Sequence, residues 1–381
     1  MKYRRNPKNG DLLSALGYGC MRFTRIGEEI DQEKAEKEML YALEHGVNYF
    51  DTAYTYPGCE VALGKFLAKG HRDKVFLTSK LPHTQVQEQA DLDRLFYETL
   101  RRLQTDHIDY YLIHMLTNKK GWQRLLNHGV EDWIAQKKKS GEIRNLGFSF
   151  HGNSKDFLEI LDAYDWDFCQ IQYNYIDIHS QGGVTALRHA ASKGLAVMIM
   201  EPLLGGKLAG SLPEAAADLF ARAKHGWSPA EWGLRWLLNQ PEVTVILSGM
   251  NELAQVEENV RVCSQAEPGQ LQPADFAVYD AVRSYINRNI KVHCTACGYC
   301  LPCPQGVNIP LCFRCYNNCY VGDYQKGLQS YKKLAMKPQE PVNASLCIQC
   351  GLCEEHCPQS LEIRRFLQDI VEDLEKKILA I

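Results

Sequence analysis

The sequence lacks several features that would place it in a specialised class of protein. It has no apolar run near the roughly 20 residues of a membrane-spanning helix. Its opening stretch, MKYRRNPKNG, has no apolar core of the kind found in signal peptides. The formal net charge of −3 gives no reason to expect nucleic acid or a membrane surface as a partner. We therefore expect a cytoplasmic globular protein.

Cysteine is scarce in the first 290 residues and abundant afterwards. Of the 15 cysteines, 11 fall between positions 294 and 357. We expect the four early ones to be small buried side chains; they are Cys20, Cys59, Cys169 and Cys263. In a reducing compartment, the late cluster favours metal over disulfides. The shift in composition predicts a first domain over residues 1–262, a linker helix over 263–290 and a second domain over 291–381.

The first 262 residues alternate between short apolar runs and longer segments with helical spacing. The runs that we expect to be strands are ALGYGCM (15–21), VNYF (47–50), KVFLTS (74–79), IDYYLI (108–113), IRNLGF (143–148), FCQIQY (168–173), LAVMIM (195–200) and VTVIL (243–247). Near-continuous apolar strands indicate burial on both faces and hence a parallel sheet. Eight strand-then-helix units in this length predict an α/β fold, a (β/α)8 TIM barrel.

A doubly wound open sheet is the alternative to the barrel. It would need a glycine-rich phosphate turn directly after a strand, and no such turn occurs there. Before the first barrel strand, Asn9-Gly10 is typical of a hairpin turn.

Polar residues follow the apolar runs where a barrel places its active site. Asp51, Lys80 and His114 each end a predicted strand, and Tyr56 lies on the loop after Asp51. A lysine ammonium near a tyrosine favours the phenolate, and Asp51 could hold the lysine by ion pairing. Tyr56 would then donate a proton to a carbonyl oxygen while His114 orients the substrate. The hydride for such a reduction must come from a cofactor.

The motifs NYFDTAYTYPGCEVALGKFL, TSKL, DYYLIH, GEIRNLGFS, CQIQYNY and EPLLGGKL resemble the aldo-keto reductase family, in order, over residues 10–262. The resemblance implies a (β/α)8 barrel that reduces carbonyls with NADPH, and it assigns the tetrad to Asp51, Tyr56, Lys80 and His114. It also implies that Ser149 and Gln170 contact the nicotinamide amide. The stretch 248–259, with Ser248, Gly249 and Asn259, matches the family's adenosine-phosphate loop.

The sequence departs from the family pattern at the expected cofactor site. Phe150 follows Ser149 where the family usually has asparagine, and Met200 stands where a tyrosine usually stacks on the nicotinamide. Met250 and Asn251 supply no positive charge for a 2′-phosphate. The choice among NADP(H), NAD(H) and flavin therefore stays open. Glu201, before Pro202, suits a turn as well as a functional role.

Two cysteine runs near the C-terminus have the spacing of iron–sulfur ligands. Their patterns are C-x2-C-x2-C-x2-C-P from Cys294 and C-x2-C-x2-C-x3-C-P from Cys347. Because the fourth cysteine of each run usually serves the other cluster, we predict two [4Fe–4S] clusters. One would be bound by Cys294, Cys297, Cys300 and Cys357, and the other by Cys347, Cys350, Cys353 and Cys303. Zinc is the weaker alternative, since its sites use paired C-x2-C motifs.

The 43 residues between the two runs are far more than compact ferredoxins have, and the domain resembles the helical ferredoxin type. We expect a helix with Tyr324, Leu328 and Tyr331 on one face, and an amphipathic helix at the C-terminus. The remaining cysteines also share one helical face, and packing explains them better than a third metal site; they are Cys312, Cys315 and Cys319.

The sequence therefore predicts an iron–sulfur oxidoreductase that acts on a small carbonyl or alcohol substrate. Its electrons would come from NAD(P)H, from the clusters, or from both, with an electron-carrier protein as a further partner. Two alternatives remain: a flavin-using barrel reductase fed by the clusters, and an electron-transfer or interaction subunit whose barrel is a scaffold.

Overall fold

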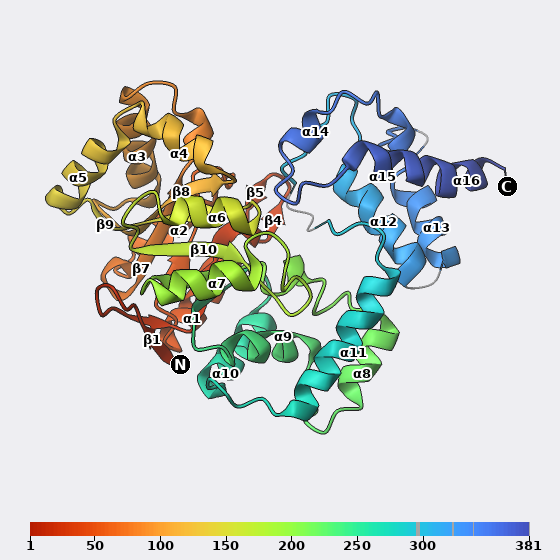
Figure 1. The fold of residues 1–381 in the computed structure, drawn as a ribbon, viewed down its shortest axis with the longest axis horizontal. Coiled ribbons are helices and arrows are strands. Elements are labelled where there is room, and N and C mark those ends of the chain that lie inside the picture. The colour runs from red at the N-terminus through yellow and green to blue at the C-terminus, as the bar shows by residue number, and fades with distance from the viewer. Residues whose placement is uncertain (295–297, 322–323, 338, 381) are drawn as a thin grey trace. The chain divides into compact units, whose positions relative to one another are not determined.

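Eight parallel strands close into a barrel in the first part of the chain (Figure 1). Around the barrel the order is β10-β11-β12-β3-β6-β7-β8-β9. The strands are β3 (Leu16–Gly19), β6 (Tyr49–Asp51), β7 (Phe76–Leu81), β8 (Ile108–Leu116), β9 (Ile143–Phe150), β10 (Phe168–Gln172), β11 (Ala196–Met200) and β12 (Val243–Ser248). Each lies within or overlaps a run that the sequence predicted, so the TIM barrel is confirmed and the open sheet is excluded.

The structure is a computed structural model that describes residues 1–294, 298–321, 324–337 and 339–380. The chain divides into two compact units. The barrel unit comprises Met1–Leu203 and Ala230–Leu271, and the helical unit comprises Leu204–Pro229 and Gln272–Ile381. These boundaries differ from those expected from the sequence. The sequence predicts that residues 204–229 belong to the barrel domain and that this domain ends at residue 262.

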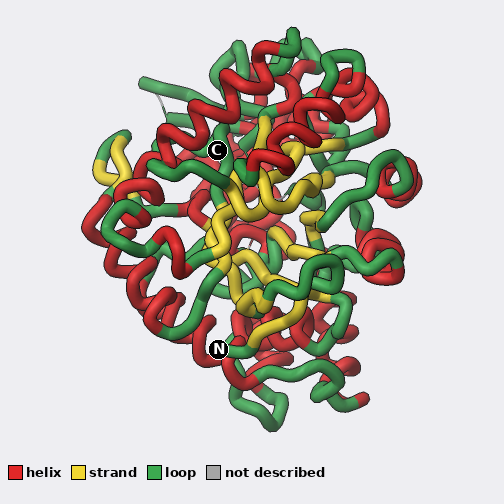
Figure 2. The backbone as a smooth tube through the Cα atoms, turned by 90° about the vertical axis from the view of Figure 1, so that its left-hand side faces the viewer, coloured by secondary structure: helices red, strands yellow, loops and turns green. Residues whose placement is uncertain are grey.

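Helices surround the barrel strands, and Figure 2 shows the strands (yellow) grouped together with helices (red) outside them. The helices of the barrel unit are α1 (Gln32–Glu44), α2 (Cys59–Leu67), α3 (Ala90–Leu103), α4 (Lys119–Leu126), α5 (Val130–Ser140), α6 (Ser154–Leu161), α7 (Gly183–Ser192), α9 (Pro229–Leu238) and α10 (Leu253–Gln265). Short elements complete it: η1 (Cys20–Arg22), β4 (Arg25–Ile26), β5 (Glu29–Ile30), η2 (Arg72–Lys74) and η3 (His83–Gln85). The four early cysteines are all buried, as the sequence predicted.

The amino-terminal hairpin, β1 (Tyr3–Arg5) and β2 (Leu12–Ser14), turns through the predicted Asn9-Gly10. Gly10 has a φ of 84°, a conformation that suits glycine. The hairpin packs against the buried interior of the barrel, where the Tyr110 hydroxyl donates to Asp11 and accepts from Asn6 Nδ2. Since Tyr110 lies near the amino end of β8, the hairpin covers that end and leaves the carboxyl ends of the strands for chemistry.

The second unit is helical. It contains η4 (Leu204–Gly206), α8 (Glu214–Ala221), α11 (Pro273–Asn289), α12 (Ile309–Val321), α13 (Tyr324–Leu334), η5 (Ala344–Leu346), α14 (Leu352–Glu355), α15 (Ile363–Ile370), the π-helical turn η6 (Val371–Glu375) and α16 (Lys376–Leu379). Its core joins apolar side chains from α12, α13 and the C-terminal helices. Cys312, Cys315 and Cys319 lie in this core.

In the described part of the chain, no helix has both the length and the apolar character needed to cross a membrane.

Candidate functional site

Lys80 and Asp51 form a buried ion pair at the carboxyl ends of neighbouring strands. Nζ of Lys80, on β7, lies 2.7 Å from Oδ2 of Asp51, at the end of β6, and 2.7 Å from the backbone oxygen of Thr52. The Lys80 side chain is fully buried. Burial raises the pKa of Asp51, and the Lys80 ammonium opposes that rise. The two contacts fix the direction in which the ammonium points.

Tyr56 lies over this pair and beside a histidine. Nζ of Lys80 is 5.1 Å from the centroid of the Tyr56 ring. The rings of Tyr56 and His114 meet edge to face, with centroids 6.1 Å apart and an interplanar angle of 82°. Tyr56 is half-buried, whereas His114 is buried. The structure therefore brings together all four residues that the sequence proposed as a catalytic tetrad.

An irregularity in β8 sets the position of His114. The pairing of β8 with β9 shifts register between Ile113 and Leu116, and Met115 takes a φ of 57°, which non-glycine residues rarely adopt. The Met115 N–H donates to Oγ of Ser149 across the irregularity, at 2.8 Å. Bulges next to active sites commonly redirect a side chain, and this one follows His114 directly.

His114 and two histidines near it or near Lys80 have lowered pKa values and are neutral at neutral pH. Burial, with the positive charge of Lys80 next in importance, places the pKa of His114 well below its ordinary value. The same two causes lower the pKa of His151 to about 4. Burial and the neighbouring Arg124 lower the pKa of His83 to about 4. At neutral pH these imidazoles can therefore donate or accept hydrogen bonds without adding positive charge.

Gln170 offers an amide to the space at the strand ends. It lies on β10 next to Ser149 on β9, and both side chains are buried. Oε1 of Gln170 has no hydrogen-bond partner within the described ranges, and Nε2 contacts the sulfur of Met200 at 3.7 Å. A buried polar atom without a partner is costly. Oε1 of Gln170 is therefore suited to accept a hydrogen bond from a bound group such as a carboxamide.

The predicted phosphate loop follows β12. Asn259 Nδ2 on α10 donates to Oγ of Ser248 at 3.0 Å, so these two side chains bind each other and fix the loop to the helix. A Cβ placed on Gly249 would lie 3.2 Å from side-chain atoms of Arg22. The absence of a side chain at Gly249 therefore lets the Arg22 side chain pack closely against this loop.

Arg22 is the cation that the sequence reasoning missed. It ends the short helix η1 after β3, and its Nη2 lies 3.7 Å from Oε1 of Glu201, just beyond β11. Glu201 has a φ of 53°, an uncommon conformation for a residue other than glycine. The first and last barrel strands are adjacent, so residue 22 reaches the loop at 249. No local sequence signal could have indicated this contact.

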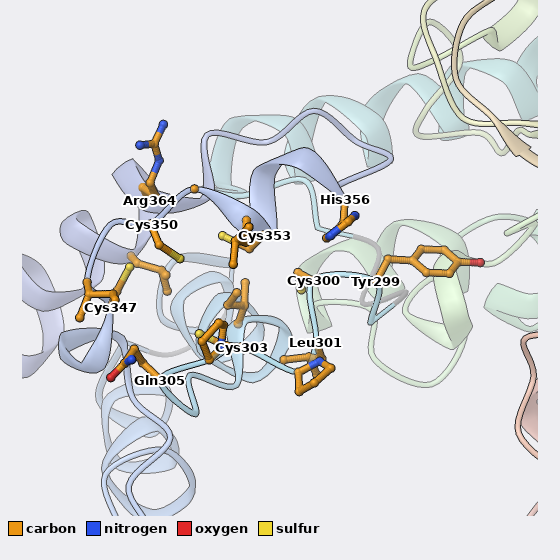
Figure 3. A pocket seen from close by; sticks show the side chains of 17 residues that line it. Tyr299, Cys300, Leu301, Cys303, Gln305, Cys347, Cys350, Cys353, His356 and Arg364 are labelled. Atoms are coloured by element: carbon orange, nitrogen blue, oxygen red, sulfur yellow. The ribbon is translucent and has the colours of Figure 1, made fainter. Parts of the chain in front are cut away.

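In the helical unit, the second cysteine run lines a cavity of about 190 Å³. The thiols of Cys303, Cys347, Cys350 and Cys353 turn toward a common space (Figure 3). They are the four that the sequence grouped, with Cys303 coming from the first run. Cys300 also lines this cavity.

A smaller cavity is lined by Cys294, Cys300 and Cys357. These belong to the other predicted set, again with one cysteine crossing from the opposite run, while Cys297 lies outside the described residues. In the described ranges no three His, Cys, Asp or Glu side chains are close enough to hold a single metal ion. An iron–sulfur cube spreads its thiolates farther apart than one ion does, so the several cysteines that line each cavity fit a cluster better.

Comparison with known proteins identifies both parts of the chain. The aldo/keto reductase family pattern matches residues 15–282, and a 4Fe-4S binding domain matches residues 340–360. An aldo-keto reductase of Mycolicibacterium vanbaalenii is 32% identical, over 60% of this chain and 77% of that protein. Methylglyoxal reductase YeaE of Escherichia coli is 29% identical, over 71% and 92%.

Among solved structures, the holo form of an aldo-keto reductase from Bacillus halodurans is similar. It has a TM-score of 0.62 and 26% identity, and the match covers 74% of this chain and 96% of that one. The barrel, the four residues at its carboxyl end and the family match agree. The chain therefore belongs to the aldo/keto reductase family of oxidoreductases and carries a 4Fe-4S binding domain as well.

Proposed function

We propose that the protein reduces a small carbonyl compound, or oxidises the matching alcohol, with Tyr56 as the proton donor. The observation that carries the proposal is the placement of Lys80, held by Asp51, 5.1 Å from the Tyr56 ring. The ammonium favours the phenolate that remains after the phenol has given its proton to the substrate oxygen. His114 is neutral and can donate a hydrogen bond to the same oxygen.

A nicotinamide cofactor would supply the hydride that adds to the carbonyl carbon. Family membership and the vacant acceptor on Gln170 support its binding, with Ser149 beside the carboxamide. Ser248, Gly249 and Asn259 would form the loop at its phosphates, and Arg22 would provide the positive charge there. Arg22 favours NADP(H) over NAD(H), although its partner Glu201 reduces the effect.

The cysteine runs would bind two [4Fe–4S] clusters, the first through Cys294, Cys297, Cys300 and Cys357, and the second through Cys303, Cys347, Cys350 and Cys353. Clusters pass single electrons, whereas a nicotinamide gives two together. Electron transfer between the clusters and the nicotinamide would therefore need a flavin or a carrier protein that exchanges one electron at a time. The proposal includes both of these possible intermediaries.

Methylglyoxal is a suitable first substrate, because one similar enzyme is named a methylglyoxal reductase. We expect anaerobic protein to consume NADPH with it, and Tyr56→Phe to lower kcat/KM by about 10²–10⁴-fold while iron content stays unchanged. Tyr54→Phe, two residues away, is the matched control. Equal turnover in Tyr56→Phe and wild type would rule out the acid role, and flavin released from denatured protein would favour the flavin-using alternative.

A further inference from the structure

A buried carboxylate lies at the end of the C-terminal π-helical turn. Glu375 is the last residue of η6 and its side chain is 2% exposed. Single π turns within α-helices are rare and are found frequently at functional sites. Glu375 and the preceding Leu374 are both buried in the helical unit.

Glu375 accepts hydrogen bonds from four donors. Oε1 accepts from the Tyr331 hydroxyl (2.5 Å) and from the N–H groups of Ala344 (2.9 Å) and Ser345 (3.3 Å). Oε2 accepts from Nδ2 of Asn343 at 2.9 Å. Three of the four donors belong to consecutive residues at the start of the short helix η5, so the carboxylate fixes this one turn from its amino-terminal end.

The turn leads directly into the second cysteine run. Cys347 follows the last residue of η5, and its N–H donates to the backbone oxygen of Ala344 at 3.0 Å. Its sulfur accepts from the backbone N–H of Gln349 at 3.4 Å and lies 3.7 Å from Nε2 of the same residue. Hydrogen bonds to cluster sulfurs tune the reduction potential. A shift of η5 would therefore change both the position of Cys347 and its hydrogen bonds.

The geometry points to Glu375 as a positioning residue for the iron–sulfur cluster that Cys347 helps to bind. This inference rests on the proposed cluster ligands. Glu375 lies outside residues 340–360, where the 4Fe-4S domain is matched. Filling the space does not explain a carboxylate, because an apolar side chain of similar size in a core is often as stable or more so. Four directional hydrogen bonds, three of them to one turn, do explain it.

The test compares three variants of the full chain, purified without air. Glu375→Leu fills the space but leaves the Ser345 N–H without its acceptor and the Ala344 N–H with only the Tyr331 hydroxyl, so we expect iron to fall from about eight to about four per chain. The reduced protein should then show the paramagnetic signal of one cluster. Glu375→Gln can keep the backbone contacts if the Asn343 amide turns over, so it should restore the iron with a shifted reduction potential. Glu372→Leu, exposed on the same turn, should match wild type.

Full iron and unchanged potentials in both Glu375 variants would overturn the inference. If Glu375→Leu loses all its iron and its helical circular dichroism, Glu375→Gln decides: a shifted potential supports positioning, and an unshifted one contradicts it. An iron-free wild type would overturn the cluster assignment, and this inference with it. If the wild type and every variant carry full iron with unchanged potentials, the cluster assignment stands and only the positioning role of Glu375 is overturned.

Discussion

Nζ of Lys80 and Oδ2 of Asp51 lie 2.7 Å apart at the ends of adjacent strands, and both side chains are buried. Each charge makes the other tolerable in a region from which water is excluded. Because Thr52 also accepts from Nζ, the ammonium is held in a single position beneath Tyr56. The pair therefore links the stability of the barrel to its proposed chemistry.

Removing one member of this pair should cost much more than removing both. Lys80→Met leaves the Asp51 carboxylate buried without its partner and should lower the free energy of unfolding by about 3–5 kcal/mol. The double variant Asp51→Leu/Lys80→Met should recover most of that loss. Chemical denaturation measures both values, and Lys34→Met, which breaks an exposed pair with Glu252, is the control that should change little. Equal losses in the single and double variants would contradict a coupled pair.

Stability should fall as the pH drops from about 6.5 to about 4. The pKa of His151 is lowered to about 4 by burial, whereas an unfolded histidine titrates near the ordinary value of 6.5. The unfolded state therefore binds more protons in this window, so its free energy falls relative to that of the folded state. His151→Gln should flatten the dependence by about 1.4 kcal/mol for each pKa unit removed. Unfolding midpoints of variant and wild type across this window give the comparison, and parallel curves would contradict the prediction.

Arg22→Met should weaken dinucleotide binding without affecting the fold. Loss of a hydrogen bond to a charged phosphate group costs about 1.5–3 kcal/mol, which corresponds to a Kd about 10- to 150-fold higher. The loss should be larger for NADPH than for NADH if Arg22 contacts the 2′-phosphate. Quenching of intrinsic fluorescence measures Kd without turnover. Arg25→Met, on the exposed strand β4, is the matched control. An unchanged Kd for both cofactors would remove Arg22 from the proposed site.

Cys350→Ala should remove one cluster, whereas Cys319→Ala should remove none. Cys350 is exposed at the cavity that the second run lines, and Cys319 is buried in the core of α12. We expect about four irons per chain in the first variant and about eight in the second. Iron analysis after anaerobic purification decides this. Equal iron in both variants would exclude Cys350 as a ligand.

The barrel and its tetrad could be predicted because their signals are local. Apolar runs such as 108–113 predict buried strands, and a polar residue that ends such a run, like Asp51 or His114, must lie at the carboxyl rim of a barrel. The cysteine sets follow similarly from spacing. The structure places Cys303 at the cavity lined by the second run and Cys357 at the cavity lined by the first, which is the crossing that the sequence predicts.

The remaining features depend on contacts between residues far apart in the chain. Arg22 meets Gly249 only because the first and last strands pair when the barrel closes. Residues 204–229 belong to the helical unit, where Phe220 packs against Tyr279. From the sequence, Glu375 would be assigned to an ordinary amphipathic helix, because a π turn has no characteristic composition.

The content of iron and acid-labile sulfide in the anaerobically purified chain tests the central claim most directly. Two [4Fe–4S] clusters in the helical unit of an aldo/keto reductase predict about eight irons and about eight sulfides per chain. A chain that carries no iron, or only about four irons at full occupancy, would contradict the two-cluster account.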